Sequence, residues 1–165
     1  MSIDTSSRQE QLPLCVDLDG TLVKTDTLVE SALALVKKNP FYVFSMLLWL
    51  FQGKEQLKHQ IAARTKLDVA LLPYNMELIE WLQSLQDSRR IVLVTAANSK
   101  IANAVADHLK IFSEVIASSE GRNLGGSEKR DELDKLYGSD GYDYVGNSSD
   151  DLVVWEHCNS AIVVD

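Results

Sequence analysis

Five short runs of apolar, largely β-branched residues recur along the chain, and they constrain its fold more than any other feature of the sequence. They are residues 12–18, 91–96, 114–118, 142–146 and 161–165. All but 142–146, which alternates, are nearly continuous in apolar character. Continuous runs of this length are typical of strands covered on both faces, so they predict a parallel sheet of five strands.

The segments between these runs have apolar residues spaced by three and four positions, which is typical of helices with one buried face. They are residues 76–87, 99–109, 128–137 and 149–157. This regular alternation of strand and helix predicts an α/β fold, doubly wound and Rossmann-like. The length of 165 residues and the apolar content of 45% suit about one such domain with a real core.

The connection between the first two predicted strands is far longer than a compact α/β unit needs. In it, Thr27 and Glu30 have the spacing of a capping box, which predicts the start of a helix. Ligands of an open α/β sheet bind beyond the carboxyl ends of its strands, so an insertion after the first strand would lie over that site. The predicted parts are a helical cap at 27–73, an α/β core made of 12–26 and 74–165, and a flexible tail at 1–11.

Charge and cysteine content exclude several classes of protein. The formal net charge of -8 argues against a nucleic-acid-binding surface, which needs clustered lysine and arginine. Cys15 and Cys158 lack the spacing of a metal site or a disulfide framework, so we interpret them as buried thiols in a reducing compartment. The polar N-terminus lacks the apolar segment of a signal peptide. The sequence thus predicts a cytoplasmic protein that binds no nucleic acid.

The segment at 41–51 is almost entirely apolar, with a single serine among its residues. As a helix it would span about half of the hydrocarbon thickness of a bilayer, so it is too short to cross a membrane. Charged and helix-breaking residues on both sides prevent its extension. Two interpretations are open at this point: a buried helix of the cap, or an apolar patch that faces a lipid or a partner.

Polar residues follow the ends of several predicted strands. Asp17 and Asp19 end the first strand, Thr95 ends the second, and residues 147–151 follow the fourth. Because the carboxyl ends of parallel strands meet at one edge of the sheet, we expect these side chains to share a crevice with Lys129. Buried carboxylates need a positive partner, and hard oxygen ligands suit Mg²⁺. The sequence therefore predicts a magnesium site assisted by Lys129.

Four segments, taken in order, resemble the four motifs of the haloacid dehalogenase-like (HAD) hydrolase superfamily. They are DLDGTLV at 17–23, Thr95 within VTAAN, Lys129 before a helix, and GNSSDDL at 146–152. The resemblance spans nearly the whole chain. It implies a phosphohydrolase that uses Mg²⁺ and forms an aspartyl-phosphate intermediate on its way to releasing phosphate.

The resemblance also implies a role for each matching residue. Asp17 would be the nucleophile that attacks phosphorus, and Asp19 would protonate the leaving group and then activate water. Thr95 and Lys129 would stabilise the transferring phosphoryl group. The phosphate-binding residues implied in this way are Thr95, Ala96, Lys129 and Gly20, and Gly20 with Thr21 would begin a flexible turn that opens and closes the site.

The fourth motif departs from the usual pattern, because Asn147 stands where the superfamily commonly places its first acidic metal ligand. An amide oxygen is neutral, so we expect Asn147 to hold Mg²⁺ less tightly than an aspartate would, with Asp150 or Asp151 carrying the anionic share. Which of the three binds the ion directly is open at this point. The implied metal ligands are Asp17, Asp19, Asn147, Asp150 and Asp151.

The order of the motifs and the apolar helical insertion also resemble the HAD domain that is fused ahead of membrane prenyltransferases of the UbiA family. This second resemblance implies that the chain is the front part of a longer protein with a C-terminal membrane domain. It would then work in the cytoplasm at the inner face of the membrane, and a prenyl or lipid phosphate would be a fitting substrate.

We therefore expect a Mg²⁺-dependent phosphatase that acts on a small phosphate ester. The alternative from another class is a weakly active or inactive HAD-like regulatory domain of a membrane prenyltransferase, which Asn147 keeps open. Hydrolysis of a carbon–halogen bond is less fitting, because Asp19 and the acidic loop would then have no metal ion to bind. A receiver domain phosphorylated on aspartate would have neither the DxDGT sequence nor an insertion after the first strand.

Overall fold

The computed structural model describes residues 12–119 and 121–164, so the predicted tail at 1–11 lies outside the described residues. At its centre is a parallel sheet of five strands in the order β3-β2-β1-β4-β5. The strands are β1 (Leu14–Val16), β2 (Ile91–Asn98), β3 (Glu114–Ser118), β4 (Asp143–Gly146) and β5 (Ser160–Val163). This sheet confirms the predicted α/β fold class and the place of each predicted strand.

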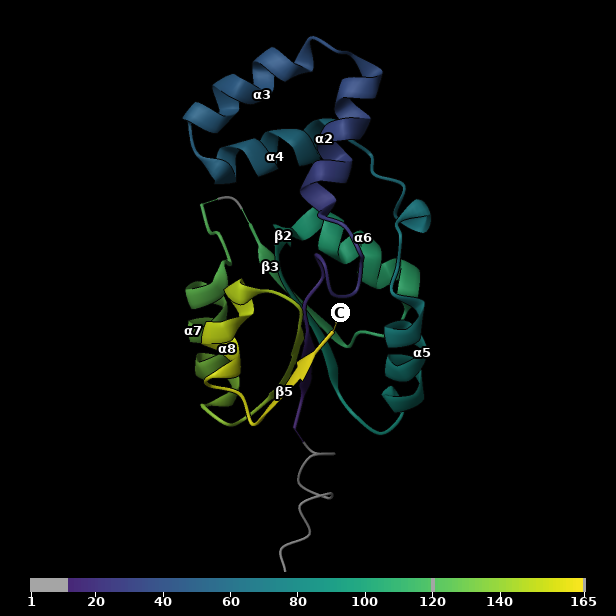
Figure 1. Ribbon diagram of the computed structural model, residues 1–165, viewed down its shortest axis with the longest axis vertical. Coiled ribbons are helices and arrows are strands. Elements are labelled where there is room, and N and C mark those ends of the chain that lie inside the picture. The colour runs from purple at the N-terminus through teal and green to yellow at the C-terminus, as the bar shows by residue number, and fades with distance from the viewer. Residues whose placement is uncertain (1–11, 120, 165) are drawn as a thin grey trace, which may run out of the picture.

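Helices cover both faces of the sheet, and Figure 1 shows α5 and α6 on one side with α7 and α8 on the other. Their bounds are α5 (Met76–Leu85), α6 (Ser99–Leu109), α7 (Gly126–Tyr137) and α8 (Leu152–Trp155). Leu14 and Val16 pack into one apolar cluster and Cys15, between them, into the other. Because alternate residues of a strand point to opposite faces, both clusters require apolar residues, which explains the continuous runs in the sequence.

The two cysteines behave as the sequence predicts. Cys15 and Cys158 are both buried and both free of a disulfide. Burial raises the pKa of the Cys158 thiol to about 11, so it stays protonated near neutral pH. Both residues therefore act as small apolar side chains of the core.

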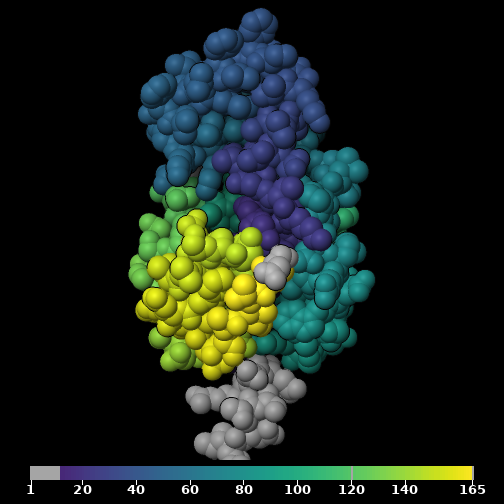
Figure 2. All heavy atoms as spheres, in the orientation of Figure 1, coloured from purple at the N-terminus to yellow at the C-terminus, as the bar shows by residue number. Residues whose placement is uncertain are grey.

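Three helices follow β1, and together we call them the lobe: α2 (Thr27–Lys38), α3 (Tyr42–Phe51) and α4 (Lys54–Arg64). They lie beyond the carboxyl ends of the strands (Figure 1) and form one end of the elongated molecule (Figure 2). A 3₁₀ turn at Val69–Leu71 leads back toward α5. The lobe therefore stands over the edge of the sheet where a ligand of an open α/β fold would bind.

The first lobe helix begins differently from the sequence prediction. Asp26, rather than Thr27, is the N-cap of α2, and its Oδ1 accepts hydrogen bonds from the amides of Leu28 at 2.7 Å and Val29 at 3.3 Å. Thr27 is instead the first helical residue, and its amide donates to Oδ1 of Asp19 at 2.7 Å. The predicted capping box of Thr27 and Glu30 is therefore wrong, because the aspartate one position earlier reaches the free amides first.

The structure also decides between the two interpretations of residues 41–51. No residue of α3 is buried, and Phe41, Phe44 and Phe51 expose 76%, 66% and 90% of their surface. The buried-helix interpretation is therefore wrong. We call the exposed set the apolar patch; it consists of Phe41, Val43, Phe44, Leu47, Leu48, Leu50 and Phe51. None of the helices in the described part of the chain is long and apolar enough to cross a membrane.

Candidate active site

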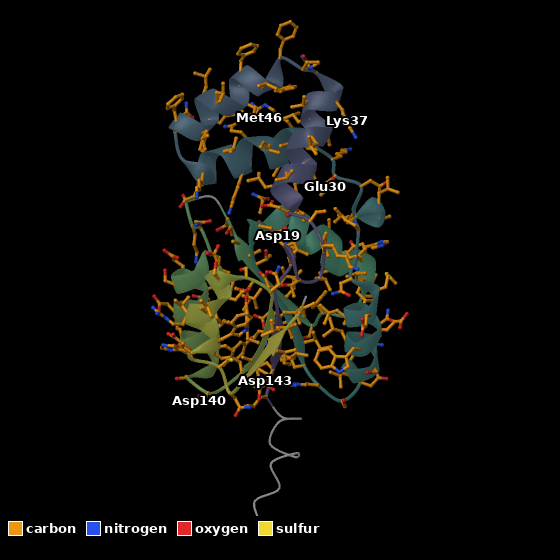
Figure 3. All side chains as sticks on the ribbon, viewed as in Figure 1. Asp19, Glu30, Lys37, Met46, Asp140 and Asp143 are labelled. Carbon is orange, nitrogen blue, oxygen red and sulfur yellow. The ribbon has the colours of Figure 1, made fainter. Side chains whose placement is uncertain are left out.

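A cavity of about 440 Å³ lies between the lobe and the carboxyl edge of the sheet. Its floor is lined by residues that follow β1 and β4, by the end of β2 and by the start of α7, and its roof by residues of the lobe. Figure 3 places Asp19 at this junction, and Asp143 at the opposite end of the sheet. The charged residues that line the cavity are Asp17, Asp19, Asp26, Lys54, Lys58, Lys129, Asp150 and Asp151.

Most of the predicted site residues come together here. Those that line the cavity are Asp17, Asp19, Ala96, Lys129, Asp150 and Asp151. Gly20, Thr95 and Asn147 do not line it. The floor of the cavity is therefore acidic, with Lys129 among its carboxylates.

A buried ion pair joins the first predicted motif to α7. Nζ of Lys129 donates to Oδ1 of Asp17 at 2.8 Å and to the hydroxyl of Tyr144 at 2.7 Å. It also lies 3.5 Å from Oδ1 of Asp151, and the Tyr144 hydroxyl donates to that same oxygen at 2.8 Å. Lys129 exposes only 5% of its surface, so its charge is stabilised by these partners rather than by water.

The protonation of this cluster follows from burial and from the charges within it. Burial raises the pKa of Asp17 to about 6, although Lys129 pulls it down, and the negative charge of Asp151 adds to the rise. Burial alone would lower the pKa of Lys129, but the carboxylates of Asp17 and Asp151 outweigh that effect and raise it. Two carboxylates thus share one ammonium, which leaves a negative potential that favours a further cation.

Asp151 is held by protein donors on both of its oxygens. Oδ2 accepts hydrogen bonds from the amides of Asn147 at 3.1 Å and Ser148 at 3.2 Å and from the Ser148 hydroxyl at 3.3 Å. This is a complete capping box at the turn Ser149–Asp151, as the spacing of Ser148 and Asp151 predicts. With Oδ1 directed at Lys129 and Tyr144, Asp151 positions Lys129 for contact with Asp17.

Asn147 lies against Gly20 and Thr21 of the first motif. The Thr21 hydroxyl is 3.4 Å from Oδ2 of Asp17 and 3.3 Å from Oδ1 of Asn147, so it lies within hydrogen-bond distance of both oxygens. Gly20 has a φ of 79°, and a Cβ at this position would collide with the Asn147 amide. Glycine is therefore required at position 20 for Asn147 to pack against the first motif this closely.

The carboxylate oxygens of Asp17 and the amide oxygen of Asn147 could hold a metal ion. Among the described residues, no group of three or more His, Cys, Asp and Glu side chains has the geometry of a metal site. A divalent ion beside the Asp17 carboxylate would therefore depend on neutral donors as well, such as the Asn147 amide oxygen, which accepts from the same Thr21 hydroxyl as Asp17. Such an all-oxygen set fits Mg²⁺, which uses one or two carboxylates and keeps several waters.

Asp19 lies at the border between floor and roof. Its Oδ1 accepts the amide hydrogen of Thr27 at 2.7 Å, which orients the carboxyl group from the first turn of α2. Burial raises the pKa of Asp19, although the hydrogen bond from Thr27 opposes that rise. The Asp19 carboxyl group therefore keeps its proton to a higher pH than a solvent-exposed aspartate does.

Thr95 differs from its predicted place. Its side chain is fully buried, and its Oγ1 accepts a hydrogen bond from the amide of Ala97 at 2.9 Å. Strand β2 continues past Thr95 to Asn98, and the pairing with β3 shifts register between these two residues. The structure therefore presents Ala96 and Ala97 to the cavity, rather than the Thr95 hydroxyl.

Four residues at or beside the cavity were missed by the sequence analysis: Asp26, Lys54, Lys58 and Tyr144. Tyr144 lies within β4, where the alternation of the YDYVG run does not indicate which face carries function. Lys58 enters from α4 of the lobe, and its Nζ donates to the carbonyl of Ala96 at 2.9 Å and to Oδ1 of Asn123 at 3.2 Å. Its spacing from Lys54, four residues before it on one helix, is the only sequence signal that could have indicated it.

No model of a protein family matches the sequence. The uncharacterized protein y4nM of Sinorhizobium fredii is 31% identical over 163 residues, which are 98% of this chain. Those residues are 31% of y4nM, so the chain spans about a third of the length of this relative.

Solved structures show the fold class. A protein of unknown function from Bordetella pertussis Tohama I has a TM-score of 0.65 at 16% identity, over 93% of this chain and 89% of that one. A phosphoserine phosphatase in apo form has a TM-score of 0.64 at 13% identity, over 93% and 86%. A HAD family hydrolase from Salmonella enterica serovar Typhi has a TM-score of 0.64 at 11% identity, over 90% and 60%. The chain thus has the fold of HAD-family hydrolases.

Proposed function

We propose that the protein is a phosphatase that transfers a phosphoryl group from a small phosphate ester to Asp17 and then to water. The observation that carries this proposal is the buried contact of 2.8 Å between Asp17 and Lys129 on the floor of a cavity. A carboxylate fixed beside an ammonium can attack a phosphoryl group whose charge that ammonium neutralises. The HAD-type fold and the phosphoserine phosphatases among the structural neighbours support the same class of reaction.

The reaction would take two displacements at phosphorus. In the first, an Asp17 oxygen forms a bond to phosphorus while the bond to the ester oxygen breaks, and Asp19 gives its proton to the leaving alkoxide. In the second, Asp19 takes a proton from water, whose oxygen attacks phosphorus and releases Asp17 and inorganic phosphate. Lys129 balances the charge on Asp17 and on the phosphoryl oxygens in both steps. The main-chain amide of Ala96 is the further phosphate-binding group that we propose. Gly20 is left out, because it does not line the cavity and its amide donates to the Val23 carbonyl at 2.7 Å.

Mg²⁺ is the cofactor that we propose, and when bound it would neutralise charge on the phosphoryl group. Asp17, the carbonyl of Asp19 and Asn147 would hold it. Asp151 has protein donors on both oxygens, so we assign it to positioning Lys129. Asp150 is exposed and lines the cavity, and its carboxylate would supply the further negative charge that the Mg²⁺ site needs.

A phosphate-release assay tests this proposal. Wild-type protein with Mg²⁺ is incubated with p-nitrophenyl phosphate and a panel of prenyl and sugar phosphates, beside Asp17→Asn and the surface control Asp131→Asn. We expect Asp17→Asn to lose on the order of a thousandfold in kcat/KM, and EDTA to stop wild-type turnover. Equal release by the wild type and Asp17→Asn would refute the assignment of the nucleophile.

We also propose that the substrate is a prenyl or lipid phosphate handled close to a membrane. The apolar patch supports this, because Leu50 belongs to the patch and also lines the cavity, so apolar surface continues from outside into the site. Lys37 and Lys38, at the end of α2, are exposed beside the patch and would favour anionic headgroups. A membrane domain of the prenyltransferase type, which the sequence resemblance implies, would place the patch at the lipid surface.

Flotation with vesicles tests the proposed membrane contact. The full chain should float with vesicles that contain anionic phosphatidylglycerol, and Phe44→Glu with Phe51→Glu should abolish flotation. Trp81→Glu, a partly exposed aromatic position on α5, is the control. Equal flotation of the wild type and the double variant would refute the contact.

The alternative is a regulatory domain with little or no catalysis. Asn147 supports this alternative, because a neutral amide stands at the position where the superfamily commonly has an acidic metal ligand. If the wild type releases no phosphate but Asn147→Asp does, the alternative is correct. Turnover by the wild type with Mg²⁺ would exclude it.

A further inference from the structure

Two lysines on the roof of the cavity form no ion pair with the carboxylates of its floor. Lys54 and Lys58 of α4 both line the cavity, and their spacing of four residues places them on one face of the helix. Nζ of Lys58 donates to the Ala96 carbonyl at 2.9 Å and to the Asn123 side-chain oxygen at 3.2 Å, and both acceptors are neutral. Among the described residues, neither lysine has a carboxylate within ion-pair distance.

Four of the five carboxylates that line the cavity have protein partners other than the roof lysines. Asp17 and Asp151 share Lys129, and Asp19 accepts the Thr27 amide. Asp26 caps α2 through the amides of its first turn. Asp150 is exposed, and Asp19 and Asp26 favour the charged form of Lys58 only from beyond ion-pair distance. Among the described residues, neither roof lysine therefore has an ion-pair partner, and both can meet an anion that enters the cavity.

The half-buried position of Lys58 makes an anionic ligand the fitting partner. Burial lowers the pKa of Lys58, because carbonyl oxygens replace only part of its hydration. An anion within hydrogen-bond distance would stabilise the ammonium by a charge-assisted bond. The transferring phosphoryl group already has Lys129 on the floor, so a second anion is what the roof can accommodate.

We propose that Lys54 and Lys58 form a subsite for a second anionic group, a carboxylate or a phosphate, carried by the leaving group of the substrate. This rests on the proposed phosphatase function and narrows its substrate class. Within the prenyl and lipid phosphates proposed above, a simple monophosphate leaves the subsite unfilled, whereas a diphosphate carries the second anionic group in its leaving group. Lys58 then determines which substrates bind well, and Asp17, Asp19 and Lys129 on the floor carry out the reaction.

Two matched pairs of substrates test the subsite. In each pair, one member adds an anionic group away from the phosphate that is cleaved: 3-phosphoglycerate against glycerol 3-phosphate, and fructose 1,6-bisphosphate against fructose 6-phosphate. We expect wild-type kcat/KM to favour the member with the added anion by about tenfold or more in at least one pair, which also tells carboxylate from phosphate. Lys58→Gln should remove this preference, and Lys58→Arg should keep most of it.

Lys100→Gln is the matched control. Nζ of Lys100 also joins core to lobe through a carbonyl, that of Ala62 at 3.3 Å, but Lys100 does not line this cavity. Its substitution should leave the preference unchanged. If Lys58→Gln lowers kcat/KM equally for both members of each pair, Lys58 contacts the phosphoryl group itself and the subsite is refuted.

A binding measurement separates this inference from the proposed function. Calorimetric titration of Asp17→Asn, alone and combined with Lys58→Gln, compares binding of 3-phosphoglycerate with glycerol 3-phosphate and of the bisphosphate with fructose 6-phosphate. A preference that requires Lys58 supports the subsite even if the wild type proves inactive, in which case only the phosphatase proposal fails. Turnover without any preference, in rate or in binding, would refute the subsite alone.

Discussion

The sheet and the lobe both contain strongly apolar segments, but they use them in opposite ways. In β1 every residue is fully buried, with one apolar cluster on each face of the sheet. In α3 no residue is buried, and Phe51 exposes 90% of its surface. Burial of apolar surface stabilises the core by about 25 cal/mol per Å², whereas the exposed side chains of α3 gain nothing until a partner covers them. Apolar sequence therefore indicates the fold in one region and an interaction surface in the other.

The same two regions differ in charge at the cavity between them. The floor carries carboxylates that share Lys129, and the roof carries Lys54 and Lys58, of which Lys58 donates to neutral oxygens. The floor is thus suited to a phosphoryl group with a cation, and the roof to a further anion.

The largest effect on stability is expected at the buried ammonium of the floor. Lys129→Met leaves Asp17 and Asp151 buried without their shared partner, which should cost about 3–5 kcal/mol of unfolding free energy. Urea denaturation measures it, with Lys135→Met at an exposed position of α7 as the control. Equal midpoints for both variants would show that the Lys129 cluster contributes nothing to the fold.

A pair of apolar truncations sharpens the contrast between core and lobe. Leu82→Ala removes a fully buried side chain of α5 and should cost about 2–5 kcal/mol. Phe51→Ala, at an exposed position, should change the unfolding free energy by about 0.5 kcal/mol or less. Thermal and urea unfolding of both variants measure these values. A comparable loss from both truncations would contradict the exposure of the apolar patch.

The Tyr144 hydroxyl gives a smaller effect. Tyr144→Phe removes the group that accepts from Lys129 and donates to Asp151, and should cost about 1–3 kcal/mol. Tyr42→Phe in the lobe is the control for loss of a hydroxyl. If Tyr144→Phe unfolds at the wild-type midpoint, the hydrogen bonds that join Lys129 to Asp151 through Tyr144 do not contribute to stability.

The smallest expected effect concerns the metal site. Asn147→Asp adds a negative charge beside Asp17 and should tighten Mg²⁺ binding by about tenfold, or about 1.4 kcal/mol. The Mg²⁺ concentration for half-maximal activity, or calorimetric titration if turnover is too slow, gives this value. Asn159→Asp, at the far end of the sheet beside Asp143, is the control. Unchanged affinity would remove Asn147 from the proposed ligand set.

The residues on the floor of the site could be predicted from the sequence because two physical rules bring them together. Strand ends converge at one edge of a parallel sheet, and a buried carboxylate such as Asp17 requires a cation such as Lys129. Thr95 could not be placed in this way, because the sequence does not show that β2 continues to Asn98 or that the Thr95 hydroxyl accepts a hydrogen bond from the Ala97 amide. Periodicity does not say whether a wholly apolar helix such as α3 is covered, and it gives no distance from Lys58 to the sheet.

Acid-quenched single turnover with ³²P-labelled substrate tests the role of Asp17 most directly. We expect label on the wild-type peptide that contains Asp17, removable by hydroxylamine as an acyl phosphate is, and none on Asp17→Asn. Release of labelled phosphate by both proteins, with no label held on either, would contradict the account.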